Sequence, residues 1–310
     1  MTGFLHLPFL FTLASKAWHI VWTRKRETRL ARRHLYNIEK QNGGKFPADL
    51  FQKIAVSYGI YVPVVVEGFC KLHARKLLPI EKKRFMYYFI CSSLFDYFVD
   101  EVHMPFDKMQ HLAFYPESTL PASFEETVFL EAHQWLLQQV NDREGYIHCS
   151  KELFLAQQQS ALQFQKNIPA SAVLDITFRK GGYAVQLGSY YIEDEVPQIE
   201  RQIWFQLGVL IQLINDLFDV WKDAPQEIRS SVLAVQDIRR YAEIFEHQVE
   251  ILWQFIEQHP AAPITKQDFL FHIAGTLSFG YIAIHQLSQL QGGKPHLPPY
   301  AIAHRKDWII

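Results

Sequence analysis

The strongest constraint on the fold of this chain is a helical periodicity that runs through most of the sequence and is interrupted at intervals by proline or paired glycine. Apolar residues recur with the spacing of amphipathic helices rather than alternating as they do in strands. The long segments also lack the turn dipeptides that punctuate a β-sheet. The sequence therefore predicts an all-α fold.

Breakers divide the chain into expected helices and leave no sign of a second domain. The breakers are Gly43-Gly44, Pro79, Pro105, Pro116 with Pro121, Pro169, Pro197, Pro225, Pro260 with Pro263, and Gly292-Gly293. The expected helices are 26–41, 47–77, 80–102, 124–140, 149–166, 170–191, 197–222, 232–258 and 265–291. We expect a single domain over residues 1–310, an orthogonal helical bundle around a central cavity, with N-terminal capping helices in 1–45 and a C-terminal tail in 293–310.

Charge and cysteine content argue against two classes of function. The net charge is −1 at pH 7, which gives no electrostatic reason for binding along nucleic acid. Cys70, Cys91 and Cys149 stand far apart without CxxC or Cys/His spacing, so neither a zinc site nor a disulfide framework is expected. This composition fits a protein of the reducing cytoplasm.

The N-terminal segment combines apolar and basic residues. Residues 4–14 are largely apolar, and the basic cluster that follows consists of Arg24, Lys25, Arg26, Arg29, Arg32 and Arg33. A secretory signal carries positive charge before its apolar stretch, and a membrane-spanning helix needs about 20 apolar residues. We therefore expect a first helix that caps the bundle. Contact with a membrane surface stays open, because apolar and basic residues stand together.

The segment 84–101, RFMYYFICSSLFDYFVDE, is apolar on every side for most of its length, as a helix at the centre of a bundle would be. Asp96 and Asp100 lie four residues apart within it, so their carboxylates share one face, with Glu101 beside them. Burying two ionised carboxylates one turn apart is costly unless a positive group compensates them. The pattern predicts a hard cation with oxygen ligands at this point.

The segment 202–223, QIWFQLGVLIQLINDLFDVWKD, repeats the pattern. Asn215, Asp219 and Asp223 follow every four residues and form one stripe, whereas Asp216 is rotated from it by about 100°. Two such helices side by side would offer Mg²⁺ carboxylate and amide oxygens, with substrate phosphate oxygens and water completing an octahedral shell.

Either acidic cluster alone is also explained as the solvated end of a helix, through Asp100 and Glu101 in one segment and Lys222 and Asp223 in the other. The two together favour a metal site, because both stand at the end of a long apolar helix and both present oxygens at four-residue spacing. The predicted metal ligands and catalytic residues are Asp96, Asp100, Asn215, Asp219 and Asp223.

These two segments resemble the conserved regions of squalene and phytoene synthases. Residues 77–101, LLPIEKKRFMYYFICSSLFDYFVDE, are similar to the first region, in which LP, an EKR-like stretch and an aromatic-rich helix precede a DxxxDE element. Residues 212–224, QLINDLFDVWKDA, resemble the second, of the form QLxNxxxDxxxDA. The resemblance implies the class I isoprenoid synthase fold and a cluster of Mg²⁺ ions, three in this superfamily, that ionises a prenyl diphosphate.

The second motif is also similar to the NxxxSxxxE triad of class I terpene cyclases. Asn215 matches the first position, Asp219 stands where Ser or Thr is usual, and Asp223 replaces Glu. Lys222 fits this pattern too, since those cyclases often carry a basic residue just before the last ligand.

The chain departs from the squalene and phytoene pattern at three points. Ser92-Ser93-Leu94 stands where an arginine is expected, residues 178–192 replace a Tyr-rich helix, and residues 225–231 replace a Gly-Arg-Tyr segment. These are features specific to a second substrate, so their absence favours cyclisation of one prenyl diphosphate over head-to-head coupling.

Basic residues at two further places could hold the diphosphate. Arg179 and Lys180 precede Gly181-Gly182, a flexible pair at which backbone could approach a ligand closely. Their position is similar to that of the phosphate-binding arginine of cyclases, although a solvated basic pair is the competing interpretation. The predicted diphosphate-binding residues are Arg179, Lys180, Lys222 and, near the C-terminus, Arg305.

The cavity walls are expected one or two turns below the carboxylates. Aromatic faces there would stabilise a carbocation by about 0.5–2 kcal/mol each without quenching it, and small residues would leave room for a long chain. An aromatic stripe at helical spacing is equally explained as ordinary core. The predicted pocket residues are Phe89, Ser92, Ser93, Tyr183, Gly208 and Gln212.

The sequence thus predicts a class I terpene synthase, a carbon–oxygen lyase that ionises and cyclises a linear prenyl diphosphate with Mg²⁺ and releases diphosphate. Head-to-head prenyl transfer of the squalene and phytoene synthase type stays open, as does a catalytically silent homologue that binds an isoprenoid. The protein is expected in the cytoplasm, with membrane association and a homodimer left open.

Overall fold

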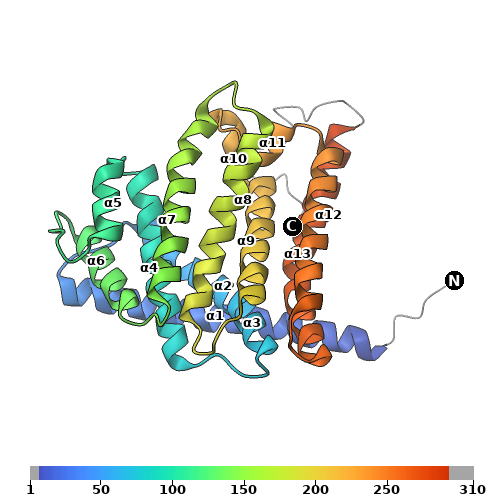
Figure 1. Ribbon diagram of the computed structural model, residues 1–310, viewed down its shortest axis with the longest axis horizontal. Coiled ribbons are helices and arrows are strands. Elements are labelled where there is room, and N and C mark those ends of the chain that lie inside the picture. Colours follow the sequence, from blue (N-terminus) through green and yellow to red (C-terminus); the bar gives the residue numbers. More distant parts are fainter. Residues whose placement is uncertain (1–6, 293–310) are drawn as a thin grey trace. The chain divides into compact units, whose positions relative to one another are not determined.

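The computed structural model describes residues 7–292, and the side chains from residue 20 onward within that range. Every regular element of residues 7–292 is helical and none is a strand, which confirms the predicted all-α class (Figure 1). The chain divides into two compact units, with the boundary after Val140. The predicted tail at 293–310 and Arg305 lie outside the described residues.

Unit 1 is built on a long first helix. Its elements are α1 (Leu7–Asn42), α2 (Ala48–Tyr61), the π-helix η1 (Val62–Val66), α3 (Glu67–Leu72), α4 (Pro79–Asp100), α5 (Phe106–Phe114) and α6 (Phe124–Leu137). Figure 1 shows α1 as one continuous helix, whereas the sequence predicted a helix only over 26–41. The predicted helix over 47–77 is interrupted by η1, where Pro63 has no amide hydrogen for an α-helical bond.

The core of unit 1 forms where α2 packs between α1 and α4, and where α4 also contacts α6. Ile54 and Leu94 are fully buried, and the Phe98 ring lies edge-on to Phe129 at 5.8 Å between centroids. Residues 48–72 are long and apolar enough to cross a membrane by length and composition alone. Most of the apolar window within this stretch is buried in the protein, as expected of a core helix.

Two buried carboxylates fix the packing of unit 1. Glu27 of α1 has no exposed side-chain surface and accepts hydrogen bonds from Lys82 at 2.7 Å and from Arg26 at 2.8 Å. Burial alone would raise the pKa of Glu27, but these two cations outweigh it and lower the pKa below its usual value. The pair with Lys82 joins α1 to α4.

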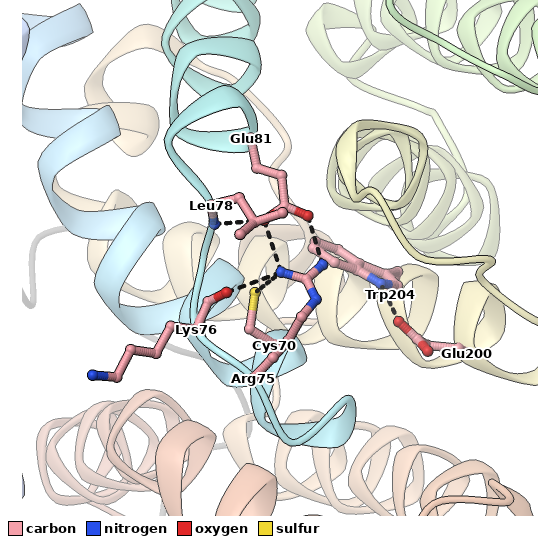
Figure 2. Close-up of polar contacts among 7 residues, drawn as sticks. All are labelled: Cys70, Arg75, Lys76, Leu78, Glu81, Glu200 and Trp204. Carbon is pink, nitrogen blue, oxygen red and sulfur yellow. Dashed lines mark hydrogen bonds and ion pairs between the residues drawn. The ribbon is translucent and has the colours of Figure 1, made fainter.

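The second buried carboxylate, Glu81, organises the beginning of α4 (Figure 2). Arg75 binds both of its oxygens, at 2.9 and 2.6 Å, and the amide of Leu78 donates to one of them at 2.8 Å. Glu81 stands at the third helical position and Pro79 at the first, which are favourable positions for a helix start. The LP and EKR-like stretch of the sequence therefore forms the N-terminus of α4 and stabilises it.

Unit 2 surrounds the apolar helix α9. Its elements are α7 (Arg143–Gln159), η2 (Ser160–Phe164), α8 (Ala170–Gln186), η3 (Leu187–Tyr191), α9 (Gln198–Phe218), α10 (Val220–Asp223), η4 (Ala224–Gln226), α11 (Ser231–Val235), α12 (Ile238–Gln258) and α13 (Pro263–Gln291). Helices α8, α12 and α13 all pack on α9. Trp204 and Leu207 of α9 are buried, as the apolar pattern of this segment leads one to expect.

Glycines allow α8 and α9 to come into very close contact. A Cβ added to Gly208 would lie 2.2 Å from the carbonyl oxygen of Gly181, and one added to Gly181 would lie 2.6 Å from the carbonyl oxygen of Gly208. A Cβ on Gly182 would meet the Phe205 ring at 2.4 Å. The glycine pair is thus occupied in helix packing, not in approach to a ligand, and the space beside Gly208 is filled by α8 rather than left for a substrate.

Replacing Gly208 with alanine is expected to destabilise the protein by about 1–3 kcal/mol, because a backbone carbonyl cannot move aside as a flexible side chain can. The free energy of unfolding, measured by urea denaturation, checks this. Gly275 is the matched control, since a Cβ there would meet nothing within 4 Å, and alanine at this exposed helical position is expected to be neutral or stabilising. Equal effects at the two glycines would contradict the packing argument.

Candidate metal and diphosphate site

The predicted acidic stripe of unit 2 lies at the junction of α9 and α10. Helix α9 ends at Phe218, and Asp219 adopts φ −92° and ψ 2°, outside the α-helical region. The four-residue spacing survives this break, because the amide of Asp219 donates to the carbonyl of Asn215 and the amide of Asp223 donates to that of Asp219. Asn215 is exposed, Asp219 is half-buried and Asp223 is buried.

The acids at this junction repel one another. Burial, together with the negative charges of Asp219 and Asp216, raises the pKa of Asp223 to about 6, although the charge of Lys222 acts in the opposite direction. A raised pKa means that the ionised form is held at a cost. A bound cation would remove that cost, so the local electrostatics favour a positive ligand here.

Asp216 is held away from the stripe by hydrogen bonds to the protein. One carboxylate oxygen accepts from Gln212 at 2.9 Å, and the other accepts from the amide of Ser231 at 2.9 Å and from its hydroxyl. The Ser231 hydroxyl also contacts that of Tyr241 at 3.0 Å. Asp216 is therefore a structural acid that joins α9 to α11, in agreement with its predicted rotation from the stripe.

The two basic residues of α8, Arg179 and Lys180, have different neighbours. The charge of Lys180 reaches Asp216 and lowers the pKa of that buried carboxyl, although burial outweighs this effect and the pKa is raised. Arg179 instead binds Glu152 of α7 at 3.0 Å and Gln159 at 2.8 Å. Of the predicted diphosphate-binding residues, Lys180 is near Asp216 of α9, Lys222 is exposed on α10, and Arg179 is engaged with α7.

The acids of α4 lie in unit 1 and are less buried than the sequence predicted. The Asp96 side chain is 39% exposed and forms an ion pair of 2.8 Å with Lys53 of α2. Asp100, the last residue of α4, is exposed. The expectation that both carboxylates are buried is wrong, because they stand where α4 reaches the surface of its unit. The positive group beside Asp96 is a lysine.

The Lys53 pair does not bar a metal ion. An ion pair between two such exposed side chains contributes about 0–1 kcal/mol. A divalent cation bound to Asp96 would therefore have little to displace. Lys53 is a partner of a candidate site residue that the sequence did not predict, and no local signal identifies it, since it lies 43 residues from Asp96 along the chain.

Some of the predicted pocket residues are buried in the packing of the helices, and the others are partly exposed. Phe89 and Ser93 are buried, and the Phe89 ring contacts Tyr61 at 5.3 Å and Tyr58 at 6.3 Å. Tyr183 is half-buried with its ring edge-on to Phe205 at 5.0 Å. The remaining three are half-buried Ser92, half-buried Gln212, which is bonded to Asp216, and buried Gly208.

The donor chemistry of the unit 2 stripe fits a hard cation. Asn215, Asp219 and Asp223 supply oxygens only, and Mg²⁺ prefers one or two carboxylates together with water and substrate phosphate. Among the described residues, no cluster of three or more His, Cys, Asp or Glu side chains is arranged to hold a metal by itself. Comparison with models of known protein families gave no match, and comparison with curated protein sequences gave none either.

Proposed function

We propose that the protein is a class I terpene synthase of the isoprenoid synthase fold, which ionises a linear prenyl diphosphate with Mg²⁺, cyclises the resulting cation and releases diphosphate. The observation that carries the proposal is the stripe of oxygen donors that Asn215, Asp219 and Asp223 form at four-residue spacing across the junction of α9 and α10. The raised pKa of Asp223 supports it, because a divalent cation would relieve the repulsion within the stripe. The two sequence motifs supply the rest of the support.

The proposal assigns two groups of metal ligands: Asp96 and Asp100 of α4, and Asn215, Asp219 and Asp223 at the junction of α9 and α10. Mg²⁺ bound to these oxygens would neutralise the leaving diphosphate and polarise its bond to the allylic carbon.

The chain's own residues then have three tasks. Lys180 and Lys222 would pair with diphosphate oxygens as negative charge develops on the leaving group. Asp216 positions the α9 end of the stripe through Ser231 and Gln212. Aromatic rings on α4 and α8 would exclude water and stabilise the cation by their faces, about 0.5–2 kcal/mol each.

A catalytically silent isoprenoid-binding protein is the second candidate, and one observation favours it. Lys53 already neutralises Asp96, as it would in a protein that has no need of a metal at this position. Such a protein would bind a prenyl diphosphate without turning it over.

The deciding experiment incubates the protein with Mg²⁺ and prenyl diphosphates of increasing chain length, and analyses organic extracts by mass spectrometry with and without NADPH. We expect release of diphosphate and a cyclic hydrocarbon from one substrate molecule, independent of NADPH and abolished by chelation of Mg²⁺. A doubled linear product would instead establish head-to-head coupling. Binding of prenyl diphosphate without any product would establish the silent alternative.

A further inference from the structure

The described part of α1 carries an exposed basic and aromatic stripe along its outer face. It is formed by Trp22, Arg26, Arg29, Arg33, Tyr36 and Lys40, and we call it the α1 stripe. These positions are spaced alternately by four and three residues, so all fall within about 40° of one line along the helix. Trp22 is 54% exposed and Tyr36 is 61% exposed.

The α1 stripe contains no acidic residue. The two carboxylates of α1 lie elsewhere: Glu27 is fully buried, and Glu39 is half-buried and accepts a hydrogen bond from the amide of Phe46. The flanking exposed positions add basic residues Arg24, Lys25 and Arg32, and apolar residues Val21 and Leu30. This concentration of positive charge contrasts with a net charge of −1 for the whole chain.

The chemistry of this face selects its partner. A second copy of the chain docked through the same face would bring the same cations against it and be repelled. Nucleic acid would pair with the cations and could stack a base on Trp22, but it offers nothing to the aliphatic Val21 and Leu30 or to the apolar sequence of residues 4–14 that precedes them. A bilayer containing anionic lipid satisfies both, because its headgroups pair with Lys and Arg while aromatic and aliphatic side chains enter the interface.

We infer that α1 docks the protein on an anionic membrane surface through the α1 stripe. The helix would lie in the plane of the interface, with Trp22 and Tyr36 at headgroup depth and the arginines against phosphate groups. This inference rests on the charges and exposure of α1 and not on the proposed chemistry.

The test measures co-sedimentation of the full-length protein with vesicles of phosphatidylcholine alone, or with a minority of phosphatidylglycerol. We expect binding only to the anionic vesicles, and loss of binding as salt shortens the screening length from about 8 Å at physiological ionic strength to about 3 Å at 1 M. The double substitution Arg29→Ser with Arg33→Ser is expected to weaken binding about 30-fold. Arg26 is left intact because it pairs with buried Glu27.

The matched control is Arg239→Ser with Arg240→Ser, which removes the same charge from exposed positions at the start of α12. It is expected to bind anionic vesicles as the unaltered protein does. Trp22→Ser keeps every charge and should weaken binding by loss of interfacial contact. Equal weakening by both arginine pairs, no binding to anionic vesicles, or tighter binding to a double-stranded oligonucleotide would each overturn the inference. Circular dichroism melting verifies that the variants are folded.

Discussion

Replacing Asp219 with alanine is expected to reduce Mg²⁺-dependent turnover of a prenyl diphosphate by at least about 100-fold, with little change in the melting temperature. Asp219 is half-buried on the proposed metal stripe, and its charge raises the pKa of Asp223. Removing it takes away one ligand but also relieves repulsion within the folded protein. Activity should therefore fall while stability is kept. Initial rates of diphosphate release over a range of Mg²⁺ concentrations measure the effect.

The control for Asp219 is its neighbour Asp216, which differs in role rather than in chemistry. Asp216→Asn keeps the shape of the side chain but replaces one acceptor oxygen with an NH₂ donor. That donor would then face either the Ser231 amide or the Gln212 side-chain amide, both of which donate to Asp216. We expect a loss of about 1–3 kcal/mol in the free energy of unfolding. Mg²⁺-dependent turnover below the melting temperature should persist and fall far less than in Asp219→Ala, because Asp216 positions the stripe but is not a proposed metal ligand. If Asp219→Ala kept full turnover, or if Asp216→Asn alone abolished it, the assignment of the stripe as the metal site would be wrong.

Much of the helical layout could be predicted because its breakers are strong local signals. Pro169, Pro197 and Pro263 each stand within one residue of the start of a helix, as the fixed backbone angle of proline favours. Gly292 takes a positive φ at the end of α13, which is the usual position of a glycine that terminates a helix.

The misplaced elements have equally local causes. No proline or glycine occurs between Pro8 and Gly43, and this uninterrupted stretch could have predicted the full length of α1. Pro63 could have predicted the irregular turn within 47–77. Helix α5 was not predicted, because nine residues between Pro105 and Tyr115 are too few to establish a periodicity.

Only those features of the candidate site that follow from the geometry of a single helix could be predicted. The four-residue spacing of Asn215, Asp219 and Asp223 follows from the helix alone. The exposure of Asp96 depends on where α4 leaves the core, and the packing role of Gly208 depends on the approach of α8. Neither is encoded near the residue in question. The surroundings of Asp96 and Gly208 therefore differ from the prediction because they are set by tertiary contacts.

Replacing Arg75 with alanine is expected to lower the free energy of unfolding by about 3–5 kcal/mol. Arg75 holds both oxygens of Glu81, whose side chain has no exposed surface, and Figure 2 shows the two side chains meeting beside Leu78. Without the guanidinium, a buried carboxylate would lose the cation that binds both of its oxygens, while the Leu78 amide would still donate to it. Urea denaturation measures the loss, and Arg33→Ala, an exposed arginine of the same unit, is expected to have little effect.

The double variant Arg75→Ala with Glu81→Gln separates the two causes of that loss. Glutamine keeps an oxygen that can accept from the Leu78 amide but carries no charge, so it needs no cation. If the loss of the Arg75 cation from a buried charge is the main cost, the double variant will be more stable than Arg75→Ala alone, since glutamine carries no charge that needs a cation. If it is equally or less stable, the contribution of Arg75 comes from packing. If the double variant is the more stable one, the LP and EKR-like stretch is explained by the electrostatics at the start of α4, independently of any substrate.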